Sequence, residues 1–408
     1  MCNEDLKQLL TNEVCENLIA KKLKTNEFKI INTIIKPLSD APQGFSGTHF
    51  FLKFEITTKN ELKTVKFFLK FKLDLDASIF YRDGNNDIYG REAEFLQLTT
   101  QYNVDWAPKL YDYVGERLLV LEDLSERGFT INVERGKFNL NDCFAGIQSL
   151  AKLNAFYFQL IHDKKKLNPN FSILKEYSNF FKEVILQLET NLGKEWCKAT
   201  IDSFNCILDE MPTSNLKIKK KINEKFNDLI EYLKPVENQY KVISHGDLWS
   251  NNIMFSNENG SPRCCFIDYQ LLRFLPPAHD ILTLLHLNTT TEFRRQHDLN
   301  QFFDYYYEQF STELNKIGLD SNVVFPMDVF KASINTSMVP VLLLNCMVKS
   351  FLLMDFTRLS TYIAENDEGL WTKERAKIIK HELDTDEKYK QAIFEEFQVL
   401  IDEIVKLL

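Results

Sequence analysis

The feature that most constrains the fold is a hairpin signal between residues 241 and 269. The run VISHGDLWSNNIMF is followed by the polar residues SNENGSP and then by RCCFIDYQ. Asn259 and Gly260 form the strongest short-range signal for a β-hairpin turn, so the apolar runs on either side are expected to pair antiparallel. Asn252 and Asp268 are equally distant from Gly260. The pattern therefore predicts that they lie opposite each other, within about 5 Å between backbones.

The polar residues of this segment indicate phosphoryl transfer. An Asn carbonyl oxygen and an Asp carboxylate, at Asn252 and Asp268, are hard oxygen ligands that suit Mg²⁺. Asp247, on the turn that enters the hairpin, is predicted to accept the proton of an attacking hydroxyl group. His245 is predicted to order the loop through backbone hydrogen bonds, and its use as the general base is the rival assignment. A base and two metal ligands are the parts that this chemistry requires.

The remainder of the chain predicts an α+β protein. Two strands are expected within residues 48–72, the second with one apolar face and one mostly cationic face, and a helix is expected over 88–100. A further hairpin is expected from LYDYVG and RLLVLED. Beyond residue 139 long helical patterns dominate. The predicted domains are thus a mainly β lobe over residues 1–124 and a mainly helical lobe over 125–408.

Composition excludes several classes of protein. A length of 408 residues exceeds what one hydrophobic core usually organises. The net charge of -9 disfavours nucleic acids and anionic membranes as partners, and the eight cysteines show no disulfide or zinc spacing. The most apolar stretch, residues 338–354, is shorter than the roughly 20 residues that cross a bilayer. We expect a cytoplasmic protein with a small-molecule partner and no obligate protein partner.

Motifs in the second half resemble a known group of enzymes. HGDLWSNNIMF followed by FIDYQ is similar to the catalytic loop and metal-binding Asp of the aminoglycoside phosphotransferase and choline kinase superfamily, relatives of protein kinases. The Trp after Asp-Leu, the IDYQ ending and FLPPAHDILTLL are most similar to the ecdysteroid-kinase-like, or CHK kinase-like, family. The resemblance implies a bilobal protein-kinase-like fold with a five-stranded antiparallel sheet in the small lobe, ATP and Mg²⁺ as cofactors, Asp247 as catalytic base, and Asp280 as an anchor for the loop.

The resemblance also implies a nucleotide site in the first 124 residues. It aligns Lys70 with the lysine that contacts the α and β phosphates and Glu92 with its helix partner. Alternation alone places Lys66, Lys70 and Lys72 on one face and does not choose among them. The backbone around Glu122, Asp123 and Leu124 is expected to bind adenine. Gly44 and Ser46 lie in the segment GFSG, where a phosphate-covering loop belongs.

The implied function is ATP-dependent phosphorylation of a hydroxyl group on a small molecule. The family suggests ecdysteroids, other steroid alcohols or xenobiotic alcohols as acceptors, with an acceptor pocket lined by C-terminal aromatic residues, namely Phe156, Tyr157, Phe158, Trp196 and Phe351. Two alternatives remain open at this point: a choline or ethanolamine kinase, and a catalytically inactive protein that binds small molecules. The intact set of Asp247, Asn252 and Asp268 speaks against the inactive protein.

Overall fold

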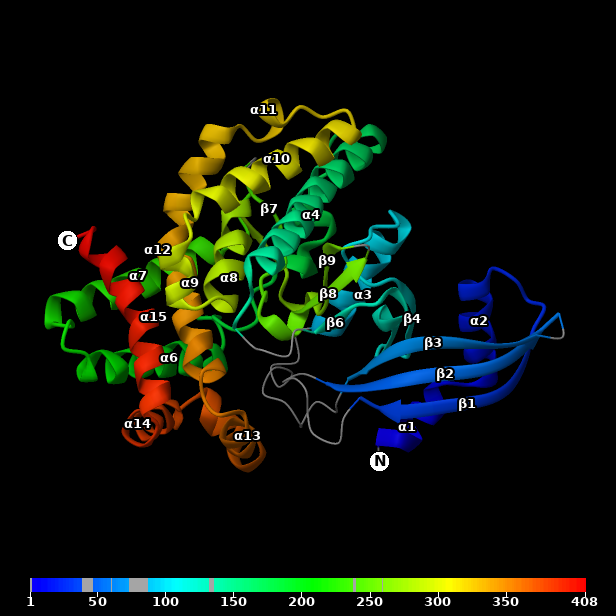
Figure 1. Ribbon diagram of the computed structural model, residues 1–408, viewed down its shortest axis with the longest axis horizontal. Helices are drawn as coiled ribbons and strands as arrows, with labels where there is room; N and C mark the ends of the chain where they lie inside the picture. The colour runs from blue at the N-terminus through cyan, green and yellow to red at the C-terminus, as the bar shows by residue number, and fades with distance from the viewer. Residues whose placement is uncertain are drawn as a thin grey trace. The chain divides into compact units, whose positions relative to one another are not determined.

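The structure is a computed structural model, and it describes residues 2–38, 47–59, 61–72, 87–131, 136–237, 240–258 and 260–408 (Figure 1). The chain forms two compact units. The first comprises residues 1–130, 254–261 and 265–270, and the second comprises residues 131–253, 262–264 and 271–408. The chain therefore returns to the first unit after the predicted catalytic loop. The predicted domain boundary after residue 124 stays a prediction.

A five-stranded antiparallel sheet organises the first unit. Its strands follow the order β1-β2-β3-β5-β4, and every neighbouring pair is antiparallel. The two predicted hairpins, β2 with β3 and β4 with β5, are confirmed. The strands are β1 (Lys29–Pro37), β2 (Thr48–Thr58), β3 (Glu61–Phe71), β4 (Leu110–Val114) and β5 (Leu118–Glu122).

The alternation in β3 sets the core of this unit. Val65, Phe67, Leu69 and Phe71 are at most 2% exposed, as the apolar face requires. They pack in one cluster with residues of two N-terminal helices, α1 (Cys2–Leu9) and α2 (Asn12–Leu23). Figure 1 shows α2 beside the sheet. The sequence pattern did not predict these two helices, and they supply the apolar cover that a half-buried sheet needs.

Further short elements are divided between the two units. The predicted helix over 88–100 is confirmed as α3 (Ile88–Gln101). A second sheet has the order β6-β8-β9. Its strands are β6 (Thr130–Ile131), β8 (Ile253–Glu258) and β9 (Ser261–Phe266), and the 3₁₀ helices η2 (Leu124–Arg127), η4 (Ser250–Asn252) and η5 (Tyr269–Leu271) flank them in the chain.

The predicted positions of two residues within the catalytic hairpin need correction. Asn252 lies in η4, ahead of β8, and Asp268 lies beyond the end of β9. Neither residue is part of a paired strand, because β8 begins one residue after Asn252 and β9 ends two residues before Asp268. Their placement opposite each other in a ladder was therefore wrong, and local loop structure sets the position of each.

Twelve α-helices and one short sheet form the second unit within its described residues. The sheet pairs β7 (Val242–Ser244) with β10 (Arg273–Leu275). The α-helices are α4 (Leu140–Leu167), α5 (Ile173–Glu176), α6 (Asn191–Glu210), α7 (Leu216–Leu233), α8 (Pro277–Asn288), α9 (Thr291–Gln296), α10 (Asn300–Lys316), α11 (Ser321–Val324), α12 (Met327–Leu352), α13 (Phe356–Trp371), α14 (Arg375–Thr385) and α15 (Glu387–Val405). A 3₁₀ helix, η3 (Ser178–Phe181), lies between α5 and α6.

Helix α8 lies at the centre of this unit. Every residue from Pro277 to Asn288 is buried. The helix contacts both α4 and α12 (Figure 1). Pro277 occupies the first helical turn, where a missing N–H costs nothing, so the double proline starts the helix. A helix that is buried on every side belongs to the core, and the polar side chains of α8 are therefore buried with it.

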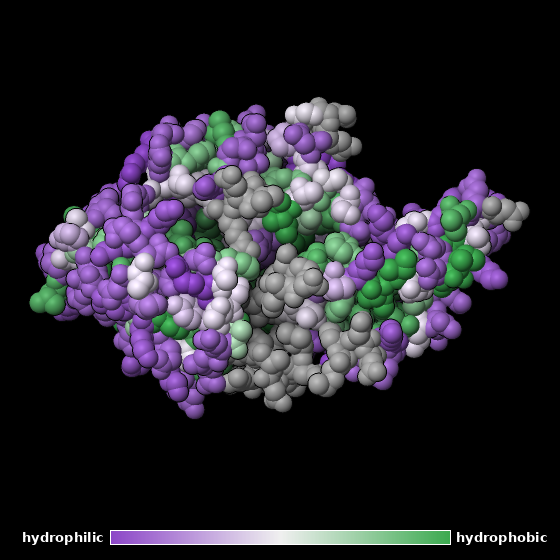
Figure 2. Space-filling view, turned by 60° about the horizontal axis from the view of Figure 1, so that its bottom comes forward, coloured by the Kyte–Doolittle hydropathy of each residue, from purple (hydrophilic) through white to green (hydrophobic). Residues whose placement is uncertain are grey.

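Helix α12 differs from its expected length. The apolar stretch was expected to be too short for a membrane, whereas α12 has 26 residues and is long and apolar enough to cross one by those criteria alone. However, 61% of its most apolar window is buried inside the protein. Figure 2 shows hydrophilic residues over much of the visible surface. The burial of α12 is that of a core helix.

Two neighbouring aromatic residues of β3 test the alternation. Phe67 is 0% exposed, whereas Phe68 is half-buried on the opposite face. Phe67→Ala should lower the free energy of unfolding by roughly 3–5 kcal/mol, because it leaves a cavity in the core. Phe68→Ala is the matched control and should cost clearly less. Urea unfolding measures both, and equal losses would contradict the assigned faces.

Candidate active site

An ion cluster in the first unit joins three distant segments. Lys70 Nζ lies 2.6 Å from Glu92 Oε2 and 2.8 Å from Asp268 Oδ1. Lys70 comes from β3, Glu92 from α3, and Asp268 from the segment after β9. Lys70 and Glu92 are 3% and 1% exposed. The structure thus brings together three of the predicted site residues within one unit.

Burial separates Lys70 from the other two lysines of its face. Lys66 is exposed and Lys72 is half-buried, whereas Lys70 is buried. Alternation gives all three the same direction, so the sequence pattern did not distinguish them. The difference arises from α3 and the segment after β9, which cover only the Lys70 end of β3 with carboxylates. Lys70 is therefore the lysine that the fold singles out.

The cluster keeps Lys70 cationic. Burial disfavours its charged form, yet Asp268 and Glu92 outweigh that effect and raise the pKa of Lys70 above its ordinary value. Burial, together with the nearby Asp268 charge, raises the pKa of Glu92 to about 7 despite its contact with Lys70. The protonated amine is thus held between two acidic groups, in a form that can bind phosphate oxygens.

Asp268 has an unusual backbone conformation. Its φ is 67°, in the left-handed region that non-glycine residues seldom adopt. Such a conformation costs roughly 1–3 kcal/mol and is concentrated at functional sites. The backbone N–H of the next residue, Tyr269, donates to Glu92 Oε1 at 3.2 Å. Glu92 therefore fixes both Lys70 and the turn that presents the Asp268 carboxylate.

The predicted catalytic loop, residues 245–252, lies in the second unit after β7. Asn252 Nδ2 donates to Asp247 Oδ2 at 2.8 Å and to the Asp247 carbonyl oxygen at 2.9 Å. His245 Nδ1 accepts the Asp247 N–H at 3.3 Å. His245 is 0% exposed. A fully buried imidazole that accepts a backbone hydrogen bond suits the ordering of the loop better than proton transfer with a substrate.

Asp280 of α8 anchors the start of the loop. Its carboxylate accepts the N–H of His245 at 2.7 Å and the N–H of Gly246 at 3.3 Å. Burial raises the pKa of Asp280 to about 6, although both hydrogen bonds and Arg273 act in the opposite direction. Gly246 has a φ of 79°, and a Cβ there would lie 2.0 Å from the Leu271 carbonyl oxygen. Glycine is therefore required at this turn.

A second ion pair supports the loop and was missed from the sequence. Arg273 Nη1 donates to the Gly246 carbonyl oxygen at 3.2 Å. The same guanidinium binds Glu183 at 2.9 and 3.1 Å. Arg273 and two backbone N–H groups hold the pKa of the buried Glu183 at about 2. An arginine inside the apolar run LLRFLP was the only sequence signal, because Glu183 lies 90 residues away.

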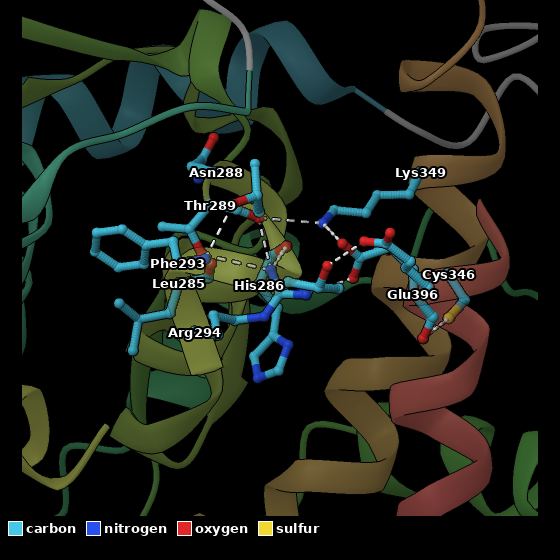
Figure 3. Close-up of polar contacts among 12 residues, drawn as sticks. Leu285, His286, Asn288, Thr289, Phe293, Arg294, Cys346, Lys349 and Glu396 are labelled. Atoms are coloured by element: carbon cyan, nitrogen blue, oxygen red, sulfur yellow. Dashed lines mark hydrogen bonds and ion pairs between the residues drawn. The ribbon is translucent and has the colours of Figure 1, made fainter. Parts of the chain in front are cut away.

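The other end of α8 contacts the same loop. Asn288 Nδ2 donates to the Leu248 carbonyl oxygen at 2.7 Å. Beyond the helix, Arg294 binds the Thr289 carbonyl oxygen and pairs with Glu396 at 2.7 Å, and Lys349 pairs with Glu396 at 2.6 Å (Figure 3). Cations are favourable at a helix C-terminus. Helices α12 and α15 thus fix the end of α8 that holds Leu248.

The residues predicted to bind the rest of the nucleotide are only partly described by the structure. Gly44 and Ser46 lie outside the described residues. Glu122 ends β5, and the carbonyl oxygens of Asp123 and Leu124 accept the N–H groups of Glu126 and Phe129. An adenine contact at Asp123 and Leu124 would therefore use their N–H groups.

The predicted pocket residues Phe156 and Tyr157 are buried in α4, and Tyr157 packs against Phe274.

Each unit holds one predicted oxygen donor of the kind that a hard divalent cation prefers. In the second unit Asn252 directs its amide nitrogen to Asp247, so its carbonyl oxygen is the remaining donor, and in the first unit Asp268 carries a carboxylate. Among the described residues no cluster of three His, Cys, Asp or Glu side chains could hold a metal alone. Magnesium bound to nucleotide phosphates needs only one or two carboxylates from protein.

A comparison with protein families identifies the class of protein. The family model for the ecdysteroid kinase-like family matches residues 81–319, and the chain belongs to that family. A search of curated proteins finds no match.

Solved structures show weaker likenesses. The GDP and kanamycin complex of APH(2")-IIia is 12% identical, with a TM-score of 0.38 over 90% of this chain and 98% of that one. Plasmodium vivax ethanolamine kinase is 16% identical, with a TM-score of 0.37 over 97% and 89%. Amicoumacin kinase hAmiN in complex with AMP-PNP, Ca²⁺ and Ami is 12% identical, with a TM-score of 0.35 over 97% and 99%.

Removal of the Asp280 carboxylate tests the anchor. Asp280→Ala leaves two buried N–H groups without an acceptor and should destabilise the second unit by roughly 2–4 kcal/mol. Asp280→Asn retains one acceptor oxygen and should lose clearly less. Urea unfolding measures both variants. If Asp280→Ala unfolded like the wild type, the loop would have another anchor.

Proposed function

We propose that the protein transfers the γ-phosphoryl group of ATP to a hydroxyl group of a small molecule. The observation that carries the proposal is the buried Lys70, held as a cation by Glu92 and Asp268 on a β-sheet face. A buried cation between two acids is costly as a purely structural device. The Lys70 amine is well suited to bind phosphate oxygens, because its positive charge is already held in place before the nucleotide binds.

Each unit supplies a different part of the proposed reaction. In the first unit, Lys70 would bind the nucleotide phosphates, and the N–H groups at Asp123 and Leu124 would bind adenine. In the second unit, Asp247 would orient the acceptor hydroxyl and accept its proton, because Asn252 fixes the direction of its carboxylate. Mg²⁺, for which the family resemblance implies Asn252 and Asp268 as ligands, would neutralise charge on the phosphates.

We propose a steroid or xenobiotic alcohol as the acceptor, an ecdysteroid first among them. Membership of the ecdysteroid kinase-like family supports this choice. The reaction removes the hydroxyl proton to Asp247, forms the bond from the hydroxyl oxygen to phosphorus, and releases ADP. The acceptor therefore needs an accessible hydroxyl group rather than an amine or a carboxylate as the reacting group.

Labelled ATP tests the proposed transfer. The wild-type protein, incubated with Mg²⁺ and a panel of ecdysone, other steroid alcohols, glycosides and choline, should label at least one alcohol. Asp247→Asn should lower turnover by roughly 10²–10⁴-fold, because it loses a positioned base. Its affinity for Mg-ATP should stay near normal. Wild-type turnover in this variant would remove Asp247 from the reaction, and labelling of choline alone would favour the alternative acceptor.

The two lysines of one face test the nucleotide site. Lys70→Met should weaken Mg-ATP binding by roughly 10- to 100-fold, the value of a hydrogen bond to a charged group. Lys66→Met removes the same charge from an exposed position of the same strand and should leave binding unchanged. Calorimetry with Mg-ATP measures both. Equal affinities for the two variants would mean that Lys70 does not contact the nucleotide.

A further inference from the structure

A buried arginine in the second unit lacks the carboxylate partner that several other buried cations have. Arg375, at the start of α14, is 1% exposed. Lys70, Arg273, Arg294 and Lys349 each pair with a carboxylate at 2.9 Å or less. Among the described residues, none forms an ion pair with Arg375. Its guanidinium donates through Nη1 to Thr200 Oγ1 at 2.7 Å, and its Nε finds no acceptor.

Aromatic rings surround this guanidinium. Its Cζ lies 4.3 Å from the centre of the Phe351 ring and 5.7 Å from that of Trp196. Trp371 stacks on Trp196 at 5.2 Å with an interplanar angle of 7°, and it contacts Phe351 at 4.8 Å. Cation–π contacts recover part of the desolvation cost of a buried charge, but they supply no hydrogen-bond acceptor.

The titratable groups that act on Arg375 are not carboxylates. The titratable groups that act on it are Tyr389 and Cys197, and burial raises the pKa of both, that of Cys197 to about 11. Burial without a carboxylate lowers the pKa of Arg375 to about 9. Arg375 is also the first residue of α14, where the helix dipole repels a cation and attracts an anion. Each of these effects is relieved by one external negative charge.

We propose that Arg375 binds the carboxylate of a small organic acid whose apolar part packs against Phe351 and Trp371. A guanidinium presents parallel N–H donors that match the two oxygens of a carboxylate. A single carboxylate also neutralises the single buried charge, whereas a phosphate dianion would leave an excess. Because Arg375 is 1% exposed, a side chain that covers it must move for the acid to enter. Trp371, the last residue of α13, belongs to the group of aromatic rings beside Arg375.

A matched pair of probes tests the site in the full-length protein. 3-Phenylpropionate carries the proposed carboxylate, and 3-phenylpropionamide has the same shape without the charge. Calorimetry should show at least roughly tenfold tighter binding of the acid, as expected for charge-assisted hydrogen bonds. Arg375→Met should abolish this preference. Lys377→Met, which removes an exposed cation from the same helix, should retain it. Equal affinities of acid and amide for the wild type would overturn the proposal.

Unfolding without any probe gives an independent test. Replacing an unpaired buried charge by an apolar residue is expected to be neutral or stabilising. The thermal midpoint of Arg375→Met should therefore equal or exceed that of the wild type. A midpoint several degrees lower, or a failure to fold, would show that Arg375 is a structural residue whose charge is already compensated. That result would overturn the proposal whatever the probes do.

Discussion

The structure depends on the rule that a charge removed from water must meet an opposite charge. Most of its buried cations follow this rule through partners that are distant in the sequence. Lys70 meets Asp268 across 198 residues, and Arg273 meets Glu183 across 90. Each pair fixes a segment that its own local sequence would leave unplaced. The desolvation cost of each charge is offset only in one arrangement of the chain, so these pairs select the positions of the functional segments as well as stabilise them.

The proposed catalytic loop shows how this selection works. Hydrogen bonds within the loop orient Asp247, and α8 holds the loop at two further points. Asp280 binds the beginning of the loop and Asn288 binds Leu248, so two ends of one buried helix hold two points of one loop. The helix is itself fixed because α4 and α12 enclose it. A large helical unit is thus a physical requirement for the precision of a short loop, since a loop on the surface is otherwise mobile.

The sequence predicted those features that local patterns encode. Alternation in β3 placed the core face correctly, and the hairpin signals located four strands of the first sheet. The motif around Asp247 located the loop. The alternation pattern could not distinguish Lys70 from Lys66 and Lys72 on the same face of β3. The difference between them depends on carboxylates from distant segments, which the pattern does not encode. Glu183 was missed for the same reason: nothing near it in the chain indicates that Arg273 will lie beside it. The prediction that Asn252 and Asp268 lie opposite each other was wrong because it counted equal numbers of residues on either side of Gly260. Such a count assumes that the two strands stay paired as far as both residues.

The same rule bears on the choice between acceptors. Recognition of a quaternary ammonium group uses the faces of aromatic rings. In the second unit the face of Phe351 is already occupied by Arg375, at 4.3 Å. A second cation placed at these rings would meet an uncompensated positive charge in a dry environment, where repulsion is strongest. A choline-like acceptor is therefore disfavoured at this position. An acid would instead give Arg375 the carboxylate partner that Lys70, Arg273 and Arg294 have within the chain.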